Sequence, residues 1–314
     1  MRLEITTVNG RSIDIDNVTQ AVLCESADAA CSSLSVTFKS KSRIDEIVSV
    51  TAFIKDKKVF FGYCDCQKTS ADKNGFENYF YARSSACLLV DSQSKPFTFV
   101  RPTARQLYIN YAREFGFKYR LGDISSNDKY EILPSTSCYG AINNFVSLIC
   151  GENIYITPDN EIVLPSPDKD AKSFDGYNIV SAKAVINRSE PLSQINFKRN
   201  VSSDYNIHTK SVLAEEMALK RERYVNLSTL PRWQREYTVL KKLKRSFDEY
   251  RLLEIVLHGY CDISLYQKFD YESEIGRFEG YIVADKKYSF SENGEQTRLV
   301  LKKRMTIGDV TYVA

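Results

Sequence analysis

The residues Phe61-Gly62-Tyr63-Cys64-Asp65 open a segment that reaches a turn at Asn74-Gly75 and then returns. A second segment, Glu279-Gly280-Tyr281-Ile282-Val283, reaches a similar turn at Asn293-Gly294. Asn-Gly between strands favours a tight β-hairpin, because both central residues of that turn need positive φ. The interval from glycine to asparagine is 12 residues in the first segment (62 to 74) and 13 in the second (280 to 293). The two hairpins predict a duplicated β module, with chance similarity of two common motifs as the alternative.

The first hundred residues have the pattern of an all-β unit. Short segments of alternating polarity are separated by turn residues, beginning with a hairpin signal at Asn9-Gly10. This spacing is typical of a small barrel or sandwich. The expected strands are Leu3–Val8, Ser12–Ile15, Val18–Cys24, Leu34–Lys39, Val48–Lys55, Val59–Gln67 and Phe76–Arg83. Near the C-terminus they are Leu252–His258, Gly280–Phe290 and Thr297–Lys303.

A compact α+β unit is predicted between the two hairpins. Thr103-Ala104-Arg105-Gln106 has the capping-box pattern, and Gly116 supplies a left-handed stop after that helix. The expected elements are the helices from Thr103 to Phe115 and Cys138–Cys150, the strands Asn153–Thr157 and Glu161–Leu164, and an exit loop over Pro165–Asp170.

A further helix is expected to begin at Pro231, with Trp233 in its apolar stripe. It follows β-like segments over Asn178–Asn187 and Ser193–Asn200. We therefore predict an α+β, mainly β protein with two β-barrel modules. Residues 1–97 plus about 178–212 would form the first barrel, 98–177 the inserted α+β domain, and 213–314 a linker helix and the second barrel.

Composition excludes several classes of function. The 314 residues include 43 basic and 40 acidic side chains, a formal charge of +3, which is too small to indicate nucleic-acid binding. No apolar run approaches the ~18 residues of a membrane span, and Met1–Ile5 lacks the apolar core of a secretory signal. A chain that folds in a cytosol is expected, with its eight cysteines mostly buried as free thiols.

Motifs that carry chemistry are sparse. The sequence has no phosphate-binding loop, dinucleotide fingerprint, nucleophile elbow or His-Glu-x-x-His. His208 and His258 are its only histidines, and neither has a convergent partner in the sequence. Cys64 and Cys66 would face one side of a strand, but no second Cys or His pair lies at ligand spacing. The sequence therefore predicts no enzyme, no catalytic or metal residues and no cofactor.

Four segments carry a resemblance to a known family. They are Val59–Tyr63, the Phe80–Asp91 segment that reads Phe-Tyr-Ala-Arg-Ser-Ser-Ala-Cys-Leu-Leu-Val-Asp, the capped helix Thr103–Phe115, and Phe278–Val283 with its Asn-Gly hairpin. In this order the chain resembles the baseplate hub proteins of contractile phage tails. The related types are the tail protein of PBSX-like defective prophages and contractile bacteriocins, the Mu-type tail protein P and the late-control-D family. Ala82 stands where many relatives carry glycine.

The resemblance implies a structural role without enzymatic activity. Family members form a trimeric ring, and each subunit contributes two tail-tube-like β-barrels, so that a threefold spike meets a sixfold tube. The implied partners are two further copies of the chain, the tail tube protein, the spike protein, the C-terminus of the tape-measure protein and a LysM-type baseplate protein. The implied location is the baseplate of a phage tail or bacteriocin particle, made in the bacterial cytoplasm, with no specific nucleic-acid binding and no membrane span.

The polar loop Lys39–Glu46 is a candidate for contact with the tube. It separates two predicted barrel strands, and charged pairs across such a joint would set its register. The expected contact residues are Lys39, Lys41, Arg43 and Asp45, with a solvated loop as the alternative. Two other functions stay open. A tail-associated peptidoglycan hydrolase needs two facing carboxylates, and a carbohydrate- or receptor-binding tail module needs an exposed aromatic platform.

Overall fold

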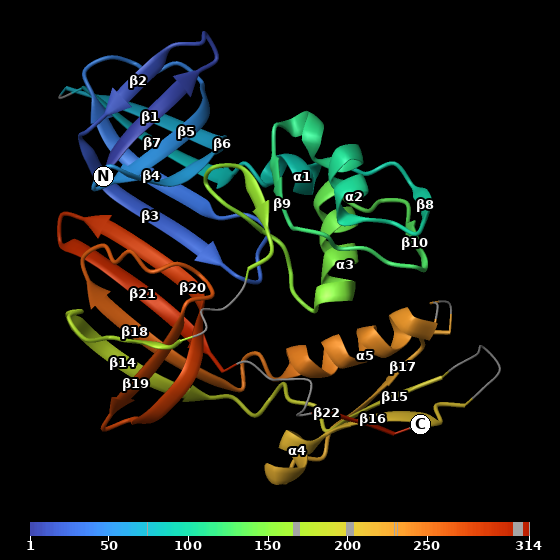
Figure 1. The fold of residues 1–314 in the computed structure, drawn as a ribbon. Coiled ribbons are helices and arrows are strands. Elements are labelled where there is room, and N and C mark those ends of the chain that lie inside the picture. The colour runs from blue at the N-terminus through green and yellow to red at the C-terminus, as the bar shows by residue number, and fades with distance from the viewer. Residues whose placement is uncertain are drawn as a thin grey trace.

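The computed structural model of the chain describes residues 1–73, 75–165, 170–198, 204–228, 230, 232–303 and 310–313. The protein is mainly β and of the α+β class. One large curled sheet, antiparallel apart from a short parallel pair, carries most of the strands, and small sheets and a few helices accompany it (Figure 1).

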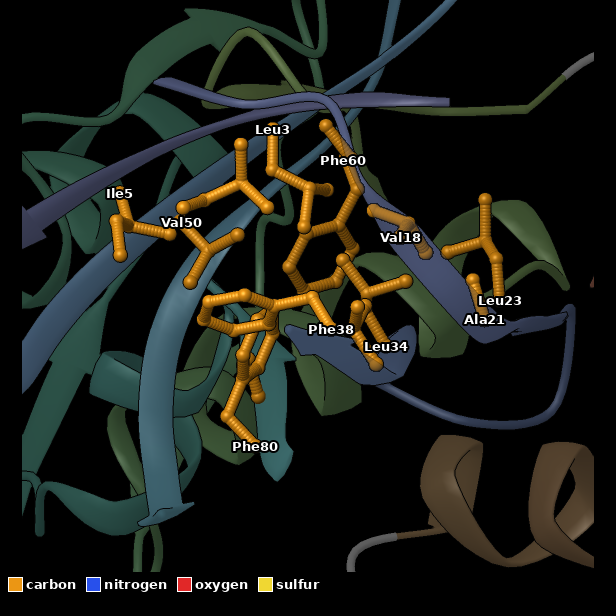
Figure 2. Packing of buried hydrophobic residues seen from close by; sticks show 14 of the residues in the cluster. Leu3, Ile5, Val18, Ala21, Leu23, Leu34, Phe38, Val50, Phe60 and Phe80 are labelled. Atoms are coloured by element: carbon orange, nitrogen blue, oxygen red, sulfur yellow. The ribbon is translucent and has the colours of Figure 1, made fainter. Parts of the chain in front are cut away.

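The N-terminal half of the large sheet contains the strands predicted from alternation. They are β1 (Arg2–Thr7), β2 (Ser12–Ile15), β3 (Val18–Ser26), β4 (Ser33–Ser40), β5 (Ile47–Ile54), β6 (Lys57–Asp72) and β7 (Gly75–Ser84). Their spatial order is β2-β1-β5-β6-β7-β4-β3. One face buries Leu3, Ile5, Phe38, Phe60 and Phe80, all at most 1% exposed (Figure 2). Burial of such side chains contributes roughly 1.5–3 kcal/mol each.

The C-terminal half continues the same sheet. Its strands are β13 (Lys172–Ser173), β14 (Ile179–Ile186), β18 (Arg251–His258), β19 (Lys268–Ser273), β20 (Gly276–Ser291) and β21 (Gly294–Lys302). The order is β14-β18-β21-β20, with β19 on the free part of β20 and β13 beside β19. β20 also pairs with β3, so the two halves form one sheet while each keeps its own apolar cluster.

The two halves repeat one pattern of strand pairing. β6 and β20 are each 16 residues long. Their bulges lie at Cys64/Cys66 and at Val283/Asp285, 219 residues apart. The same offset relates the pair Leu34↔Ala82 to the pair Leu253↔Leu301, and it also relates β5 to β19. Residues 33–84 and 252–303 are therefore two copies of one unit without insertion or deletion.

The two sequence motifs that indicated this duplication do not both fall at equivalent positions of the repeat. Gly75 and Gly294 begin the return strands at equivalent positions, but Gly62 is equivalent to Tyr281 and not to Gly280. Asn74 lies outside the described residues. The predicted repeat is therefore present in the strand pairing, although the two Gly-Tyr pairs differ by one position.

The inserted unit packs around its own apolar core. Its elements are α1 (Cys87–Asp91), β8 (Phe97–Val100), α2 (Ala104–Tyr111), η1 (Arg113–Phe115), β9 (Lys118–Arg120), β10 (Lys129–Ile132), α3 (Cys138–Cys150), β11 (Tyr155–Ile156) and β12 (Glu161–Val163). The predicted capping box is confirmed, because the Thr103 side chain accepts from the Gln106 N–H and the Gln106 side chain accepts from the Thr103 N–H. Gly116 and Gly151 end their helices with left-handed φ values of 81° and 77°.

A fourth unit lies below the insert in Figure 1. The helix α5 (Arg232–Ser246) packs on a small sheet, and their side chains share an apolar cluster. The sheet contains β15 (Gln194–Phe197), β16 (Ile207–Ser211), β17 (Glu222–Val225) and β22 (Val310–Val313), with the short helix α4 (Val212–Glu216) after β16. The predicted helix start at Pro231, the Trp233 side chain and residues 166–169 of the predicted exit loop lie outside the described residues.

The pairing of residues 178–212 differs from the prediction that joined them to the first barrel. β14 pairs with β18 in the C-terminal half, and β15 and β16 belong to the small sheet under α5. Alternation fixes which face of a strand is buried but not which strand lies beside it. The remaining domain boundaries stay a prediction.

Candidate functional site

Three of the four predicted contact residues lie in the loop between β4 and β5, and the fourth, Lys39, lies near the end of β4. Lys39, Lys41, Arg43 and Asp45 are all exposed. Ile44, in the middle of the loop, is only 8% exposed and packs into the N-terminal core. An apolar anchor of this kind holds the loop on the large sheet while its charged neighbours face outward.

Hydrogen bonds fix the same loop from both ends. Asn9 Nδ2 donates to Asp45 Oδ2 at 3.0 Å, and Gln67 Nε2 donates to the Asp45 carbonyl oxygen at 3.3 Å. Asp45 therefore stabilises the loop itself. Among the described residues, Lys41 and Arg43 form no ion pair within the chain, so their charges remain available to a partner.

The large sheet also ends in open strand edges. β14 pairs with β18 on one side only, and its Val180 and Ile186 are 60% and 66% exposed. β6 has a second opening, because β5 pairs with it only as far as Tyr63. Within the described part of the chain, no strand covers the outer side of β6 from Asp65 to Asp72. Exposed edges of this kind are templates for pairing with another chain.

Arg83 joins the large sheet to the inserted unit. Its guanidinium group binds Asp65 in the bulge of β6, at 2.5 and 3.1 Å, and Asp91 at the end of α1, at 2.6 and 3.1 Å. The hydrogen bonds from Arg83 hold the pKa of Asp91 below its ordinary value. Ser85 adds a second link, since its Oγ donates to Asn160 Oδ1 at 2.6 Å. The Arg-Ser-Ser…Asp segment of the sequence is thus a structural joint.

A polar groove separates α5 from the end of α3 and from the large sheet. Its cavity measures about 100 Å³. Lys241 Nζ donates to Ser147 Oγ at 2.8 Å, and burial lowers the pKa of this lysine to about 8. Burial also raises the pKa of Asp248, which follows α5 and lines the same groove, to about 6. Lys241 and Asp248 are both partly desolvated, and neither forms an ion pair among the described contacts. The groove is therefore a polar contact region between the unit with α5, the inserted unit and the large sheet.

A second hollow lies where the β19–β20 hairpin meets the segment after β13, and it measures about 540 Å³. Four carboxylates and three rings line it, but Phe174 is 6% exposed and stacks on Phe269 with ring centroids 4.4 Å apart. Tyr271 and Phe278 are half-buried. Much of the aromatic surface is therefore used in packing.

The described residues contain no group of three or more His, Cys, Asp or Glu side chains placed to hold a metal ion. The β6 bulge lies between Cys64 and Cys66, so the two thiols do not follow regular strand alternation. His208 Nδ1 lies 2.6 Å from Asn196 Oδ1, and His258 is exposed. None of the helices that the structure describes is long and apolar enough to cross a membrane.

Comparison with solved structures assigns this architecture to a class: the chain has the fold of phage tail proteins. It matches the tail protein of Neisseria meningitidis MC58 with a TM-score of 0.76 at 16% identity, covering 96% of both chains. It matches the 43 kDa tail protein of prophage MuSo2 from Shewanella oneidensis with a TM-score of 0.78 at 14% identity, covering 96% of this chain and 98% of that one.

The likeness extends to secretion machinery. An Escherichia coli component of the type VI secretion system, described as similar to the T4 tail proteins gp27 and gp5, matches with a TM-score of 0.60 at 9% identity, covering 99% of this chain and 79% of that one. The predicted resemblance is therefore confirmed for the fold. No protein-family model matches the sequence, and no curated protein matches it.

Proposed function

We propose that this protein is a structural, non-enzymatic hub of the baseplate in a contractile injection system. In this role three copies form a ring that joins a sixfold tail tube to a threefold spike. The two halves of the large sheet are then tail-tube-like β-barrel modules. The tube protein and the spike protein are its principal partners, with the tape-measure C-terminus and a LysM-type baseplate protein as further ones.

The observation that carries the proposal is the duplicated unit at a constant offset of 219 residues. A chain with two equivalent modules gives six modules in three copies, so the same ring can present threefold and quasi-sixfold surfaces. Head-to-tail contacts close into such a ring when the rotation per subunit is right. The open edges of β14 and β6 are the kind of surface that such contacts need.

The mass of the purified full-length protein tests this role. Light scattering after size-exclusion chromatography should give three times the 35.9 kDa of one chain, and electron microscopy should show a ring with six lobes. A protein that stays monomeric at every concentration, and also inside intact particles, would contradict the hub. A zymogram on peptidoglycan should remain blank, whereas a clear band would favour the hydrolase instead.

A further inference from the structure

The two halves of the chain meet in a joint with two parts. In the first part, β3 pairs antiparallel with residues 285–290 of β20, and Leu23 lies opposite Tyr288. In the second, the β5–β6 hairpin reaches the loop after β18. There Lys57 Nζ donates to both carboxylate oxygens of Asp262, at 2.6 and 2.8 Å.

Because the unit is repeated, each surface used in this joint has an equivalent surface in the other half, and that equivalent surface pairs with no strand among the described residues. β14 lies on β18 as β3 lies on β4, since Ala184 pairs with Leu253 where Leu23 pairs with Leu34. Among the described residues, β14 has nothing on its other side. The segment of β6 that is equivalent to the β3-binding part of β20 is 66–71, and no strand in the described ranges pairs with its outer side.

The loop and the hairpin also have counterparts. The β4–β5 loop is equivalent to the loop after β18, and Arg43 takes the place of Asp262. The β19–β20 hairpin is equivalent to the β5–β6 hairpin. It carries Glu274 in place of Lys55, Gly276 in place of Lys57, and a further acid, Glu272, in place of Phe53.

The equivalent hairpin and loop also carry opposite charges, but the sign on each is the reverse of that in the contact inside the chain. Inside the chain, the hairpin is basic, with Lys55 and Lys57, and the loop offers an acid. In the open pair, the loop presents Lys41 and Arg43, while its Asp45 is bound by Asn9. The hairpin has a net negative charge, because Glu272, Glu274 and Glu279 outnumber its lone Arg277, which lies 2.6 Å from Glu279 and 4.0 Å from Glu272. Lys41, Arg43, Glu272 and Glu274 are all exposed.

We propose that a second copy of this chain fills both counterparts at once. In the ring, β14 of one copy adds to the open edge of β6 in the next, and the acidic β19–β20 hairpin of the first copy docks on Lys41 and Arg43 in the β4–β5 loop of that neighbour. The register of the in-chain joint places Ala184 opposite Thr69. This interface rests on the proposed ring, and it gives Lys41 and Arg43 a role between copies of the chain, in place of contact with the tube.

Charge reversal tests the loop–hairpin contact. The variants are Lys41→Glu with Arg43→Glu on the loop, and Glu272→Lys with Glu274→Lys on the hairpin. Each pair alone should weaken assembly at least tenfold in light-scattering titrations, and the four changes together should restore it, since opposite charges then face again. A matched control is Glu215→Lys with Glu216→Lys, two exposed acids on α4 outside the interface, which should leave assembly unchanged.

Cysteine cross-linking tests the strand register. Ala184→Cys with Thr69→Cys, in a Cys66→Ser background, should give a covalent trimer on a non-reducing gel, because directly opposed residues in antiparallel strands have Cα atoms ~4.5–5.5 Å apart, within disulfide reach. Ser181→Cys with Thr69→Cys is the out-of-register control and should give none.

The outcomes separate the interface from the hub. A trimer that resists both charge reversals and does not cross-link would overturn this interface and leave the hub role intact. A chain that is monomeric in every form would overturn the hub and the interface together.

Discussion

Replacing Gly62 by alanine should damage the protein more than any other single methyl group added to its glycines. A Cβ at this position would lie 2.0 Å from the backbone oxygen of Arg83 and 2.8 Å from Cζ of Phe60. A carbon–oxygen contact settles at about 3.3 Å, so β6 and β7 must separate by about 1.3 Å. That is more than a quarter of the ~4.8 Å spacing between neighbouring strands.

The cost of Gly62→Ala follows from these displacements. Separation by this distance breaks about two ladder hydrogen bonds, each contributing about 1 kcal/mol. Phe60 is 1% exposed and has no free space to move into, and overpacking a core costs about 1–3 kcal/mol. The expected loss is about 3–5 kcal/mol. With a urea dependence of about 3 kcal/mol per M, the unfolding midpoint of the N-terminal half, followed by circular dichroism, should fall by at least about 1 M.

Gly280→Ala is the matched control, since the sequence pairs these two glycines. Gly280 has a φ of +66° but no atom within 4 Å of its would-be Cβ. Its replacement costs only the left-handed strain of about 1–2 kcal/mol. Equal losses of unfolding free energy for the two variants, or a greater loss for Gly280→Ala, would refute the view that the close approach of the Arg83 backbone requires glycine at position 62.

Three other perturbations give expected results of different kinds. Asp248→Asn should remove a fall in stability between about pH 4 and pH 6: burial raises the folded-state pKa of Asp248 from 3.8 to about 6, so the unfolded chain releases this proton first and folding is penalised as the pH rises. The check is the difference in urea midpoint from the unmodified protein at pH 4.5 and at pH 6.5. Asp91→Asn should change global stability by less than about 1 kcal/mol, because the pair is partly exposed, yet it should speed hydrogen exchange in α1 by loosening the Arg83 joint. Phe145→Ala, at 0% exposure, should cost about 3–5 kcal/mol and should lower only the thermal transition of the inserted unit.

Local patterns in the sequence predicted the elements that short-range physics decides. Alternation located the N-terminal strands because one face of each is buried. The capping box at Thr103 and the stop at Gly151 located helix ends, since both satisfy backbone groups within one turn. α1 was not predicted, because its five residues are too few for a periodic signal and its end is held by side-chain contacts between Asp91 and Arg83.

The open surfaces could be predicted only in part. The sequence identified the β4–β5 loop as charged and peripheral, and Lys41 and Arg43 are exposed as expected. It gave no sign that Asp45 would be bound by Asn9, which comes from a separate hairpin. The open edge of β6 depends on where β5 begins, because the first residue of β5 that pairs with β6 is Ser49, opposite Tyr63. Edge exposure is a property of pairing that residue type does not encode.

In the proposed ring, a reversal of charge between the joint inside the chain and the contact between copies would let the two halves differ in partner while keeping one pairing register. If both hairpins were basic and both loops acidic, the hairpin of one copy would suit its own loop and a neighbour's equally well. With Lys57 facing Asp262 inside the chain and Arg43 left for an acidic hairpin outside, every wrong combination brings like charges together. Specificity then comes from repulsion in the wrong pairing as much as from attraction in the right one. In the proposed ring the two kinds of half would then alternate, which is the arrangement that a threefold assembly of six modules requires.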